Sequence, residues 1–362
     1  MKKFSSLLLV SLLIATCLLS ACSSTSKEVP PDTGNTTITV EDALGRTVTF
    51  EQLPQRIVIA GRSNFMVNDA VYLFPQAAER VVALTKANQR NEFTALFEPQ
   101  IEDKARLTAD ASADEIAALN PDVVLLKSFM ADKLGRTLEE LDIPVVYLGL
   151  ETQAQYVDDI ATLGALLGEE ERAAEINAFY QQQLEKISGL VSKATEKPRV
   201  LVVRYDAQSG EVALKVPSLE WMQSWMAEFA GGELVWEEAA ASGWTVVNLE
   251  QIAAWDPEVV FVISYFTDVE EAVAKIKGDP IWQTLTAVQA GKVYGFPQDY
   301  YSWDQPDTRW ILGVTWLAKR VQPELCAELD IQETFYDFYR LYGLDDETID
   351  AEVLSRLQGD IQ

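Results

Sequence analysis

The sequence predicts an α/β protein of two Rossmann-like lobes with mainly parallel sheets, joined by one long connecting helix, with a ligand cleft between the lobes. Three observations predict this fold. Short apolar runs of strand character alternate with helical segments in both halves, a long helical segment lies between the halves, and a fifteen-residue phrase occurs once in each. The expected boundaries are a signal peptide at 1–21, a lipidated cysteine and flexible tether at 22–37, a first lobe at 38–150, the connecting helix at 151–195 and a second lobe at 196–362.

The N-terminus has the pattern of a secretory leader. The basic start MKK precedes the apolar run FSSLLLVSLLIATCLLS, which is short for a membrane span. The leader ends in LSAC, which resembles the bacterial lipobox and predicts lipidation of Cys22. The next segment, SSTSKEVPPDTGNTT, has too few apolar residues to pack and predicts a flexible tether. We therefore expect an extracytoplasmic protein, held at the cell surface or on the periplasmic face of a membrane through its lipid alone.

The expected elements of the first lobe follow in order. Short β-rich runs are predicted in TVTFEQLPQRIVIAG. A helix and then a strand at 81–84 are predicted in NFMVNDAVYLFPQAAERVVAL. A helix around 113–119, the strand DVVLLKS, a helix around 133–141 and the strand PVVYLGL complete the lobe. Apolar runs without period-two alternation predict strands buried on both faces of a parallel sheet.

The connecting segment and the second lobe continue this pattern. The helical period runs over 152–193 with a possible break at Gly168, and the remaining 25 residues or so would reach about 37 Å. RVLVVRY then predicts a strand, and Ser218 is a suitable N-cap for a helix that ends near 230. Later, KVYGFP predicts a strand and ILGVTWLAKRVQPE the helix that follows it.

The repeated phrase predicts where a ligand would bind. EIAALNPDVVLLKSF at 115–129 and QIAAWDPEVVFVISY at 251–265 are identical at seven of fifteen positions. Both predict a helix, a proline-containing turn, a buried strand and a serine at the end of the strand. Ligands of open α/β sheets bind beyond the carboxyl ends of the strands, so a cleft is expected between Ser128-Phe129 and Ser264-Tyr265.

Composition narrows the class of function. The formal charge of −27 disfavours a nucleic-acid partner. The chain has no histidine and three cysteines. Cys17 lies in the predicted leader and Cys22 is the predicted lipidation site, so Cys326 has no cysteine to pair with. We expect no disulfide, zinc or iron–sulfur site and no cofactor. Without a nucleophile or phosphate-loop motif the protein is not expected to be an enzyme. A carboxylate-based extracytoplasmic enzyme and an adhesive lipoprotein with an empty cleft remain the alternatives from other classes.

Several phrases together resemble the periplasmic-binding-protein family that serves ABC importers of iron siderophores, cobalamin and haem. They are QRIVIAG, SADEIAALNPDVVLL with DIPVVYL, NLEQIAAWDPEVVFVIS and DPIWQTLTAVQAGKVYGFP, and the resemblance covers 39–324. It implies a monomeric lipoprotein that captures an iron–siderophore or similar metal chelate and delivers it to a permease and its ATPase, with modest lobe closure. A corrinoid, haem or molybdate-type oxyanion remains an alternative ligand. The absence of histidine argues against the His-rich sites that hold bare zinc or manganese ions.

The expected ligand contacts come from the strand ends. DYYSWDQPDTRW forms a strand-to-helix loop at the carboxyl end of the second sheet, where rings can pack on a chelate and a guanidinium can pair with its oxygens. The predicted ligand-binding residues are Arg62, Asn64, Arg90, Tyr205, Trp244, Tyr265, Tyr300, Tyr301, Trp303 and Arg309.

The resemblance also implies an acid on the outer rim of each lobe that docks onto arginines of the permease. Asp132 and Asp268 are 136 positions apart, as the two phrases are, and each follows its repeated strand. One alternative is that each aspartate caps the helix after it. Other rim acids, such as Glu270 and Glu271, are also open as docking residues.

Overall fold

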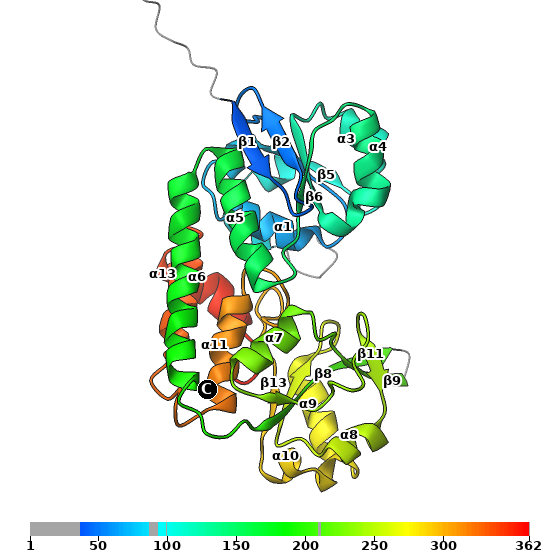
Figure 1. The fold of residues 1–362 in the computed structure, drawn as a ribbon, viewed down its shortest axis with the longest axis vertical. Coiled ribbons are helices and arrows are strands. Elements are labelled where there is room, and N and C mark those ends of the chain that lie inside the picture. The colour runs from blue at the N-terminus through cyan, green and yellow to red at the C-terminus, as the bar shows by residue number, and fades with distance from the viewer. Residues whose placement is uncertain (1–36, 87–92, 99, 209–210, 362) are drawn as a thin grey trace, which may run out of the picture. The chain divides into compact units, whose positions relative to one another are not determined.

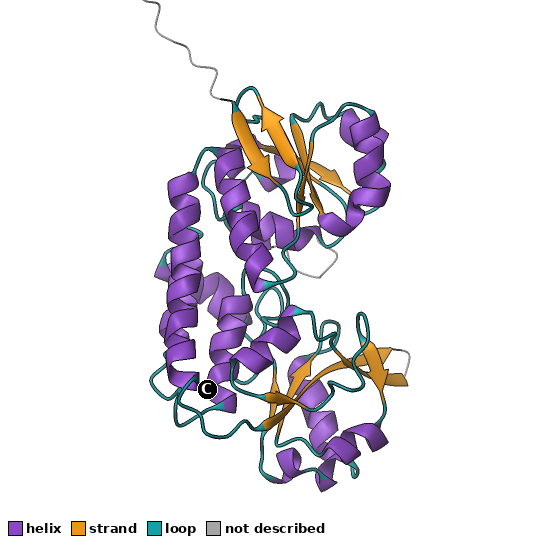
Figure 2. Cartoon of the chain, viewed as in Figure 1, coloured by secondary structure: helices purple, strands orange, loops and turns teal. Residues whose placement is uncertain are grey.

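The computed structural model describes residues 37–361 except 87–92, 99 and 209–210 (Figure 1). The predicted signal peptide, Cys17, Cys22, most of the tether and Arg90 therefore lie outside the described residues. Residues 37–362 form one compact unit. Within the described part, two separate sheets divide this unit into the predicted pair of α/β lobes (Figure 2).

The first lobe contains a five-stranded sheet in the order β5-β4-β3-β6-β7, and every strand pair in it is parallel. Its strands are β3 (Ile57–Ile59), β4 (Val81–Thr85), β5 (Ala105–Leu107), β6 (Val123–Lys127) and β7 (Val145–Leu148). All residues of β3, β6 and β7 are buried, which explains their unbroken apolar runs. An antiparallel hairpin precedes the sheet, made of β1 (Ile38–Glu41) and β2 (Thr47–Phe50). The helices of this lobe are α1 (Asn64–Val71), α2 (Ala77–Arg80), α3 (Ala113–Ala117) and α4 (Arg136–Glu140).

The second lobe contains a six-stranded sheet in the order β11-β9-β8-β12-β13, with β10 paired to β8. Its strands are β8 (Arg199–Gln208), β9 (Glu211–Val216), β10 (Glu233–Leu234), β11 (Thr245–Val247), β12 (Val259–Ile263) and β13 (Val293–Gly295). Strands β8, β10, β12 and β13 are parallel, whereas β9 and β11 add an antiparallel edge. The helices are α7 (Met222–Phe229), α8 (Leu249–Trp255), α9 (Val269–Gly278) and α10 (Thr286–Gln289). The predicted start of α7 at Ser218 was wrong, because Trp221 occupies the N-cap position.

The predicted single connecting helix is two helices. Gly168 adopts a left-handed conformation at φ 68° and ends α5 (Gln153–Leu167), and α6 (Glu170–Val191) begins two residues later. Helix α5 packs against β1 and belongs to the first lobe, while α6 also packs against α11 (Trp310–Val321) of the second lobe. At 22 residues α6 is about 33 Å long, so it alone is the connector.

The repeated phrase has the same structure in both lobes. Helices α3 and α8 each begin with a capping box, formed by Ser112 with Glu115 and by Asn248 with Gln251. Each helix then leads into the strand next to one edge of its sheet, β6 or β12. Sequence identity at these positions therefore reflects one shared unit of helix, turn and strand.

The turns after the two helices also match in detail. Asn120 and Asp256, which are 136 positions apart, both have a positive φ, of 49° and 40°. An arginine at the start of the neighbouring strand ties each turn, since Arg56 donates to the carbonyl of Asn120 and Arg199 donates to that of Trp255. The sequence match thus marks a structural repeat.

The C-terminal segment reaches back to the first lobe. It contains α12 (Ile331–Arg340), α13 (Asp346–Thr348) and short turns at Ile349–Val353 and Leu354–Arg356. The Tyr342 hydroxyl donates to the carbonyl of Asp69 at 3.0 Å, and Arg172 of α6 donates to the carbonyl of Leu341. Residues after α11 therefore join both lobes rather than only extending the second.

The remaining short helical turns are Phe93–Leu96, Ile101–Asp103, Ser128–Met130, Ala131–Gly135 and Trp282–Thr284. Among the described residues, no helix combines the length and the apolar character that crossing a bilayer requires.

Candidate ligand-binding site

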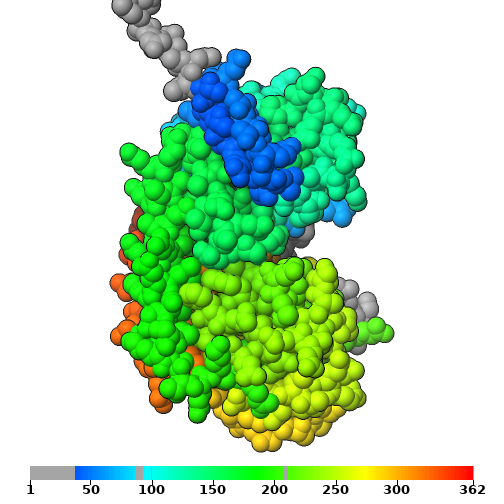
Figure 3. All heavy atoms as spheres, in the orientation of Figure 1, coloured from blue at the N-terminus to red at the C-terminus, as the bar shows by residue number. Residues whose placement is uncertain are grey.

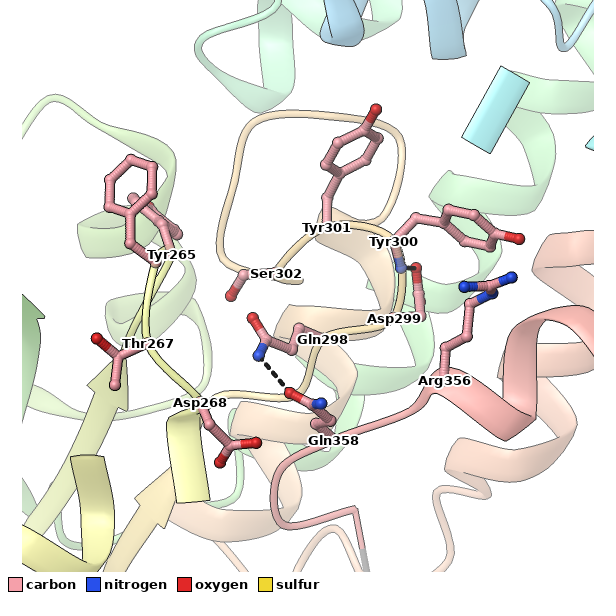
Figure 4. A pocket seen from close by; sticks show the side chains of 11 residues that line it. Tyr265, Thr267, Asp268, Gln298, Asp299, Tyr300, Tyr301, Ser302, Arg356 and Gln358 are labelled. Atoms are coloured by element: carbon pink, nitrogen blue, oxygen red, sulfur yellow. Dashed lines mark hydrogen bonds between the residues drawn. The ribbon is translucent and has the colours of Figure 1, made fainter. Parts of the chain in front are cut away.

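The carboxyl ends of the second-lobe strands open onto a pocket of about 340 Å³. Its walls are the loop after β12, with Tyr265 and Asp268, the loop after β13, with Tyr300 and Tyr301, and Arg356 of the C-terminal segment (Figure 4). On the face drawn in Figure 3 the surface is indented between the two lobes. The site predicted from strand ends therefore coincides with a concave surface.

The floor of this pocket is fixed by polar contacts. Gln298 Nε2 donates to Gln358 Oε1 at 2.8 Å, and the two backbones also bridge, which attaches the C-terminal segment to the loop (Figure 4). The Arg356 guanidinium lies 4.9 Å from the centroid of the Tyr300 ring. Arg356 was not predicted from the sequence, because it follows no strand.

Arg309, a predicted ligand contact, is instead enclosed by carboxylates. Its side chain is fully buried and pairs with Asp69 of α1 at 2.7 Å, Asp299 at 2.8 Å and Asp307 at 3.3 Å. Phe93 of the first lobe lies under the guanidinium carbon at 4.1 Å. In this structure Arg309 has no surface for a ligand, so the expectation of a direct contact is not supported. It joins the lobes instead.

Trp303, another predicted contact, is also internal. It is fully buried, donates from Nε1 to Asp299 Oδ2 at 2.7 Å and packs on Phe335 of α12. Close packing extends to the helix behind it, because a Cβ on Gly313 of α11 would lie 2.2 Å from the Trp303 carbonyl oxygen. Trp303 therefore shapes the loop from inside rather than facing a ligand.

Tyr300 and Tyr301 belong both to the pocket wall and to the contact between the lobes. Both line the pocket, yet most of each ring is buried against the first lobe. The centroid of Tyr301 lies 4.7 Å from that of Phe65, and Tyr300 lies 5.3 Å from Phe93. The loop that contains them is thus both a wall of the site and part of the contact between lobes.

Rings of the C-terminal segment complete this contact. Phe93 meets Tyr342 edge-on at 4.9 Å, and Phe97 stacks on Tyr342 at the same distance. The Tyr339 hydroxyl donates to Asp299 at 2.5 Å. We call Asp69, Asp299, Asp307 and Arg309, together with these rings, the interlobe cluster. The segment FYDFYRLY, at 335–342, is rich in aromatic residues, and this could have predicted that its rings are buried. The sequence does not indicate which residues they contact.

Burial dominates the acid–base behaviour of the interlobe cluster. Desolvation raises the pKa of Asp69 to about 6 and that of Asp307 to about 8, although Arg309 lowers both. Burial alone would lower the pKa of Arg309, but the nearby Tyr339, Asp299, Asp307 and Asp69 raise it well above the usual value. The guanidinium therefore stays charged.

The other predicted contacts divide between cleft and core. Arg62 is exposed after β3 and pairs with Asp110 at 2.6 Å. Asn64 is buried and donates to the carbonyl of Thr85 at 2.6 Å, so it ties β4 to α1. Tyr205 lines a different cavity, next to Leu214 and Lys275. The expected ligand contacts of Asn64 and Tyr205 are therefore not supported by this structure.

Trp244 and Tyr265 converge on Arg204, the residue before Tyr205. The Arg204 guanidinium carbon lies 4.7 Å from the Tyr265 ring and 5.3 Å from the Trp244 ring. Successive side chains of a strand point to opposite faces, so Arg204 and Tyr205 lie on opposite faces of β8. The pattern of apolar residues in RVLVVRY predicts a strand but does not indicate which face of it Arg204 or Tyr205 occupies.

Buried Asp304 holds Tyr265 in place. It accepts hydrogen bonds from Tyr265 at 2.5 Å, from Ser302 at 2.5 Å and from Gln223 at 3.1 Å. Desolvation raises the pKa of Asp304 to about 6, against the lowering effect of these three donors. The ring beside Arg204 is therefore fixed in advance of any ligand.

The two rim aspartates have different local roles. Asp268 is the N-cap of α9, and its Oδ1 accepts from the backbone of Glu270 and Glu271, so the capping alternative holds for it. Asp132 caps no helix; its side chain is 91% exposed and pairs with Arg136 at 2.9 Å. Neither arrangement tests docking. In the described part of the chain, no three His, Cys, Asp or Glu side chains are grouped to hold a metal ion.

Two α/β lobes connected by one long helix, with rings and cations at the carboxyl ends of the strands, define a two-lobed solute-binding protein. The chain belongs to the periplasmic binding protein family, whose model matches residues 58–300. It is thus an extracytoplasmic solute-binding protein of the ABC-transporter type and not an enzyme.

Individual relatives agree with this assignment. The molybdate-binding protein MolA of Haemophilus influenzae is 25% identical over 359 residues, covering 92% of this chain and 96% of MolA. The Fe(3+) dicitrate-binding periplasmic protein FecB of Escherichia coli is 29% identical over 264 residues, covering 70% of this chain and 80% of FecB. A periplasmic solute binding protein from Veillonella parvula has the same fold, with a TM-score of 0.71 at 21% identity, over 88% of this chain and 98% of that one.

Proposed function

We propose that this protein captures an iron–siderophore or similar metal chelate outside the cytoplasm and delivers it to an ABC permease. The observation that carries the proposal is the pocket at the carboxyl ends of β12 and β13, which is lined by Tyr265, Tyr300, Tyr301 and Arg356. Rings and a guanidinium suit the organic shell and negative oxygens of a complexed metal. The described residues offer no cluster for a bare ion, which favours a metal that arrives already complexed.

The relatives support a metal-containing anion. FecB is named as a binding protein for Fe(3+) dicitrate, and MolA is named as a binding protein for molybdate. Both are similar to this chain over most of its length, so a ferric chelate is our first candidate and a molybdate-type oxyanion the second. Corrinoids and haem follow, since neither has a counterpart among these names.

Ligand titration tests the proposal directly. We expect the tryptophan fluorescence of residues 37–362 to change saturably with one of the following: ferric dicitrate, a ferric catecholate, a ferric hydroxamate, molybdate, cobinamide or haemin. Trp244→Phe should reduce the signal, because this half-buried ring lies beside Arg204 at the strand ends, whereas buried Trp316→Phe serves as the control. If none of these compounds binds, the proposal is contradicted.

We also propose that Asp132 and Asp268 dock onto the permease. Asparagine caps a helix as well as aspartate does, so Asp268→Asn removes the charge and keeps the start of α9. The double variant Asp132→Asn/Asp268→Asn should lower uptake at least about tenfold, as expected for the loss of two charged contacts. Asp132 is not among the residues that line the pocket, so Asp132→Asn alone should lower uptake with ligand affinity unchanged. Glu185→Gln, on the exposed side of α6, is the control. Normal uptake by the double variant would remove these residues as docking acids.

Membrane attachment through Cys22 and a monomeric state complete the proposal. Both rest on the sequence alone, and Cys22 lies outside the described residues. Cys22→Ser should move the protein from the membrane fraction to the medium or periplasm, and light scattering of residues 37–362 should give the mass of one chain.

A further inference from the structure

We propose that the C-terminal segment at 354–361 is a specificity-determining wall of the candidate pocket, and that it restricts the ligand to a compact chelate or oxyanion. This inference rests on the proposed function and narrows its class of ligand by size. Arg356 and Gln358 of the segment line the pocket (Figure 4). The segment lies beyond residues 58–300, which the family model matches, so membership of the family does not by itself predict this wall.

Hydrogen bonds fix the wall against the loop after β13. Gln358 N donates to the carbonyl of Gln298 at 2.8 Å, and Gln298 N donates to the carbonyl of Gln358 at 3.1 Å. The side chains repeat this contact, since Gln298 Nε2 donates to Gln358 Oε1 at 2.8 Å. Because three hydrogen bonds connect one pair of residues, the wall cannot move away from the loop without losing all of them.

Asp360 anchors the end of the segment. Its Oδ2 accepts from the backbone N–H of Gly295 at 2.8 Å. Its carbonyl accepts from Trp316 Nε1 and, at 2.8 Å, from Arg320 Nη2. Gly295 ends β13 and Trp316 is a fully buried residue of α11. The segment is thus attached to the sheet and to a core helix as well as to the loop.

Gly359 permits this close approach of two backbones. Its φ is 92°, in the left-handed region, and a Cβ there would lie 3.0 Å from the carbonyl oxygens of Gly295 and Phe296 and from the Cα of Pro297. These are backbone atoms, which cannot rotate aside as the end of a side chain can. Any side chain at position 359 would therefore displace the segment from the loop.

The facing walls are held in place as well. Tyr300 and Tyr301 are buried against rings of the first lobe, and Tyr265 donates to buried Asp304 at 2.5 Å. The Arg356 guanidinium lies 4.9 Å from the centroid of the Tyr300 ring, which brings the C-terminal wall into contact with the loop wall. A pocket that is held on both sides cannot widen to accept a larger ligand.

The volume of the pocket suits a small ligand. At about 340 Å³ it lies near the lower end of the usual range for ligand pockets, about 300–1,000 Å³. Ferric dicitrate and molybdate are compact, whereas a hexadentate siderophore, a corrinoid or a haem surrounds its metal with a larger organic shell. Fixed walls around a small volume therefore favour the compact class.

Comparison of a compact with a bulky ligand tests the inference. We expect the protein to bind ferric dicitrate or molybdate at least about tenfold more tightly than ferrichrome, a neutral ferric trihydroxamate, since the size of a pocket discriminates by about this factor or more. Arg356→Ala shortens the wall, whereas Arg356→Met removes the same charge and keeps the length. Affinity for ferrichrome should be about tenfold higher in Arg356→Ala than in Arg356→Met.

A second variant tests the position of the wall. Gly359→Ala should lower the ratio of the affinities for the compact ligand and for ferrichrome at least about tenfold, because it displaces the segment. Gly291→Ala is the matched control, since Gly291 has a similar φ of 72° but no atom within 4 Å of an added Cβ. Should Gly359→Ala fail to accumulate, the two Arg356 variants decide, because that side chain is 43% exposed and not required for folding.

The outcomes separate the inference from the proposed function. Wild-type binding of ferrichrome as tight as that of ferric dicitrate and molybdate would overturn the inference while the function stands. Equal affinities of Arg356→Ala and Arg356→Met for ferrichrome, or an unchanged ratio in folded Gly359→Ala, would overturn it as well. Binding of none of these compounds would overturn both.

Discussion

Replacing Arg309 with methionine is expected to lower the free energy of unfolding by about 3–5 kcal/mol at neutral pH. Asp69, Asp299 and Asp307 surround one guanidinium, and all four side chains are buried. Removal of the cation leaves these carboxyl groups without their partner, so each must either stay charged without compensation or take up a proton where water cannot reach it. Because Asp69 belongs to the first lobe and the other two to the second, the loss should weaken the contact between lobes.

Urea and thermal unfolding, followed by tryptophan fluorescence, measure this effect. Arg340→Met is the matched control, since Arg340 forms exposed pairs with Asp337 and Asp346 and its loss should leave the free energy of unfolding almost unchanged. Should Arg309→Met fail to accumulate, Arg309→Lys keeps the charge and is expected to lose less stability. A stability of Arg309→Met within about 1 kcal/mol of wild type would contradict a central role for the interlobe cluster.

Thermal stability is expected to be higher at pH 5 than at pH 8. Burial raises the pKa of Asp69 and Asp304 to about 6, of Asp159 to about 7 and of Asp307 to about 8, from an ordinary 3.8. Between pH 4 and these values the folded protein binds more protons than the unfolded chain. The free energy of unfolding therefore falls as pH rises through this window.

The size of the effect can be judged from one group. A rise of about two pKa units at Asp304 corresponds to about 3 kcal/mol, and each kcal/mol shifts Tm by about 2–4 °C in a protein of this size. We expect Tm to drop by at least about 5 °C between pH 5 and pH 8, and the slope to flatten in Asp304→Asn. The surface carboxyls Glu115 and Asp345 have pKa values lowered from an ordinary 4.5 and 3.8, so they affect stability only below pH 5, outside the compared range. A Tm that increases steadily from pH 5 to pH 8 would contradict the prediction.

Local patterns in the sequence were sufficient for most of the fold. The repeated phrase predicted two lobes, and the structure confirms it down to matching capping boxes and left-handed turns at Asn120 and Asp256. The sequence indicated Gly168 as a break in the connecting helix, but the helical spacing of apolar residues is present both before and after it. Only its backbone conformation shows that α5 and α6 are separate helices.

The surroundings of the predicted site residues could not be derived from the sequence, for two physical reasons. Side-chain direction on a strand changes at every residue, so a choice between Arg204 and Tyr205 requires knowledge of which face meets the cleft. The surroundings of Arg309 depend on Asp69, 240 positions earlier in the chain, and no local pattern reports such a partner. The loop with Tyr300 and Tyr301 was predicted at the strand ends and lines the candidate pocket there, whereas its burial against Phe65 and Phe93 was not foreseen.

The buried contact between lobes has a consequence for whether the chain can be divided. One continuous apolar core runs from Val40 of the first lobe to Val353 near the C-terminus, through Phe93 and Tyr301. A cut within α6 would expose this surface on both halves and leave Arg309 and Asp69 on different polypeptides. We therefore expect the two lobes to unfold together as one cooperative unit, and neither lobe to function when it is exchanged alone between relatives.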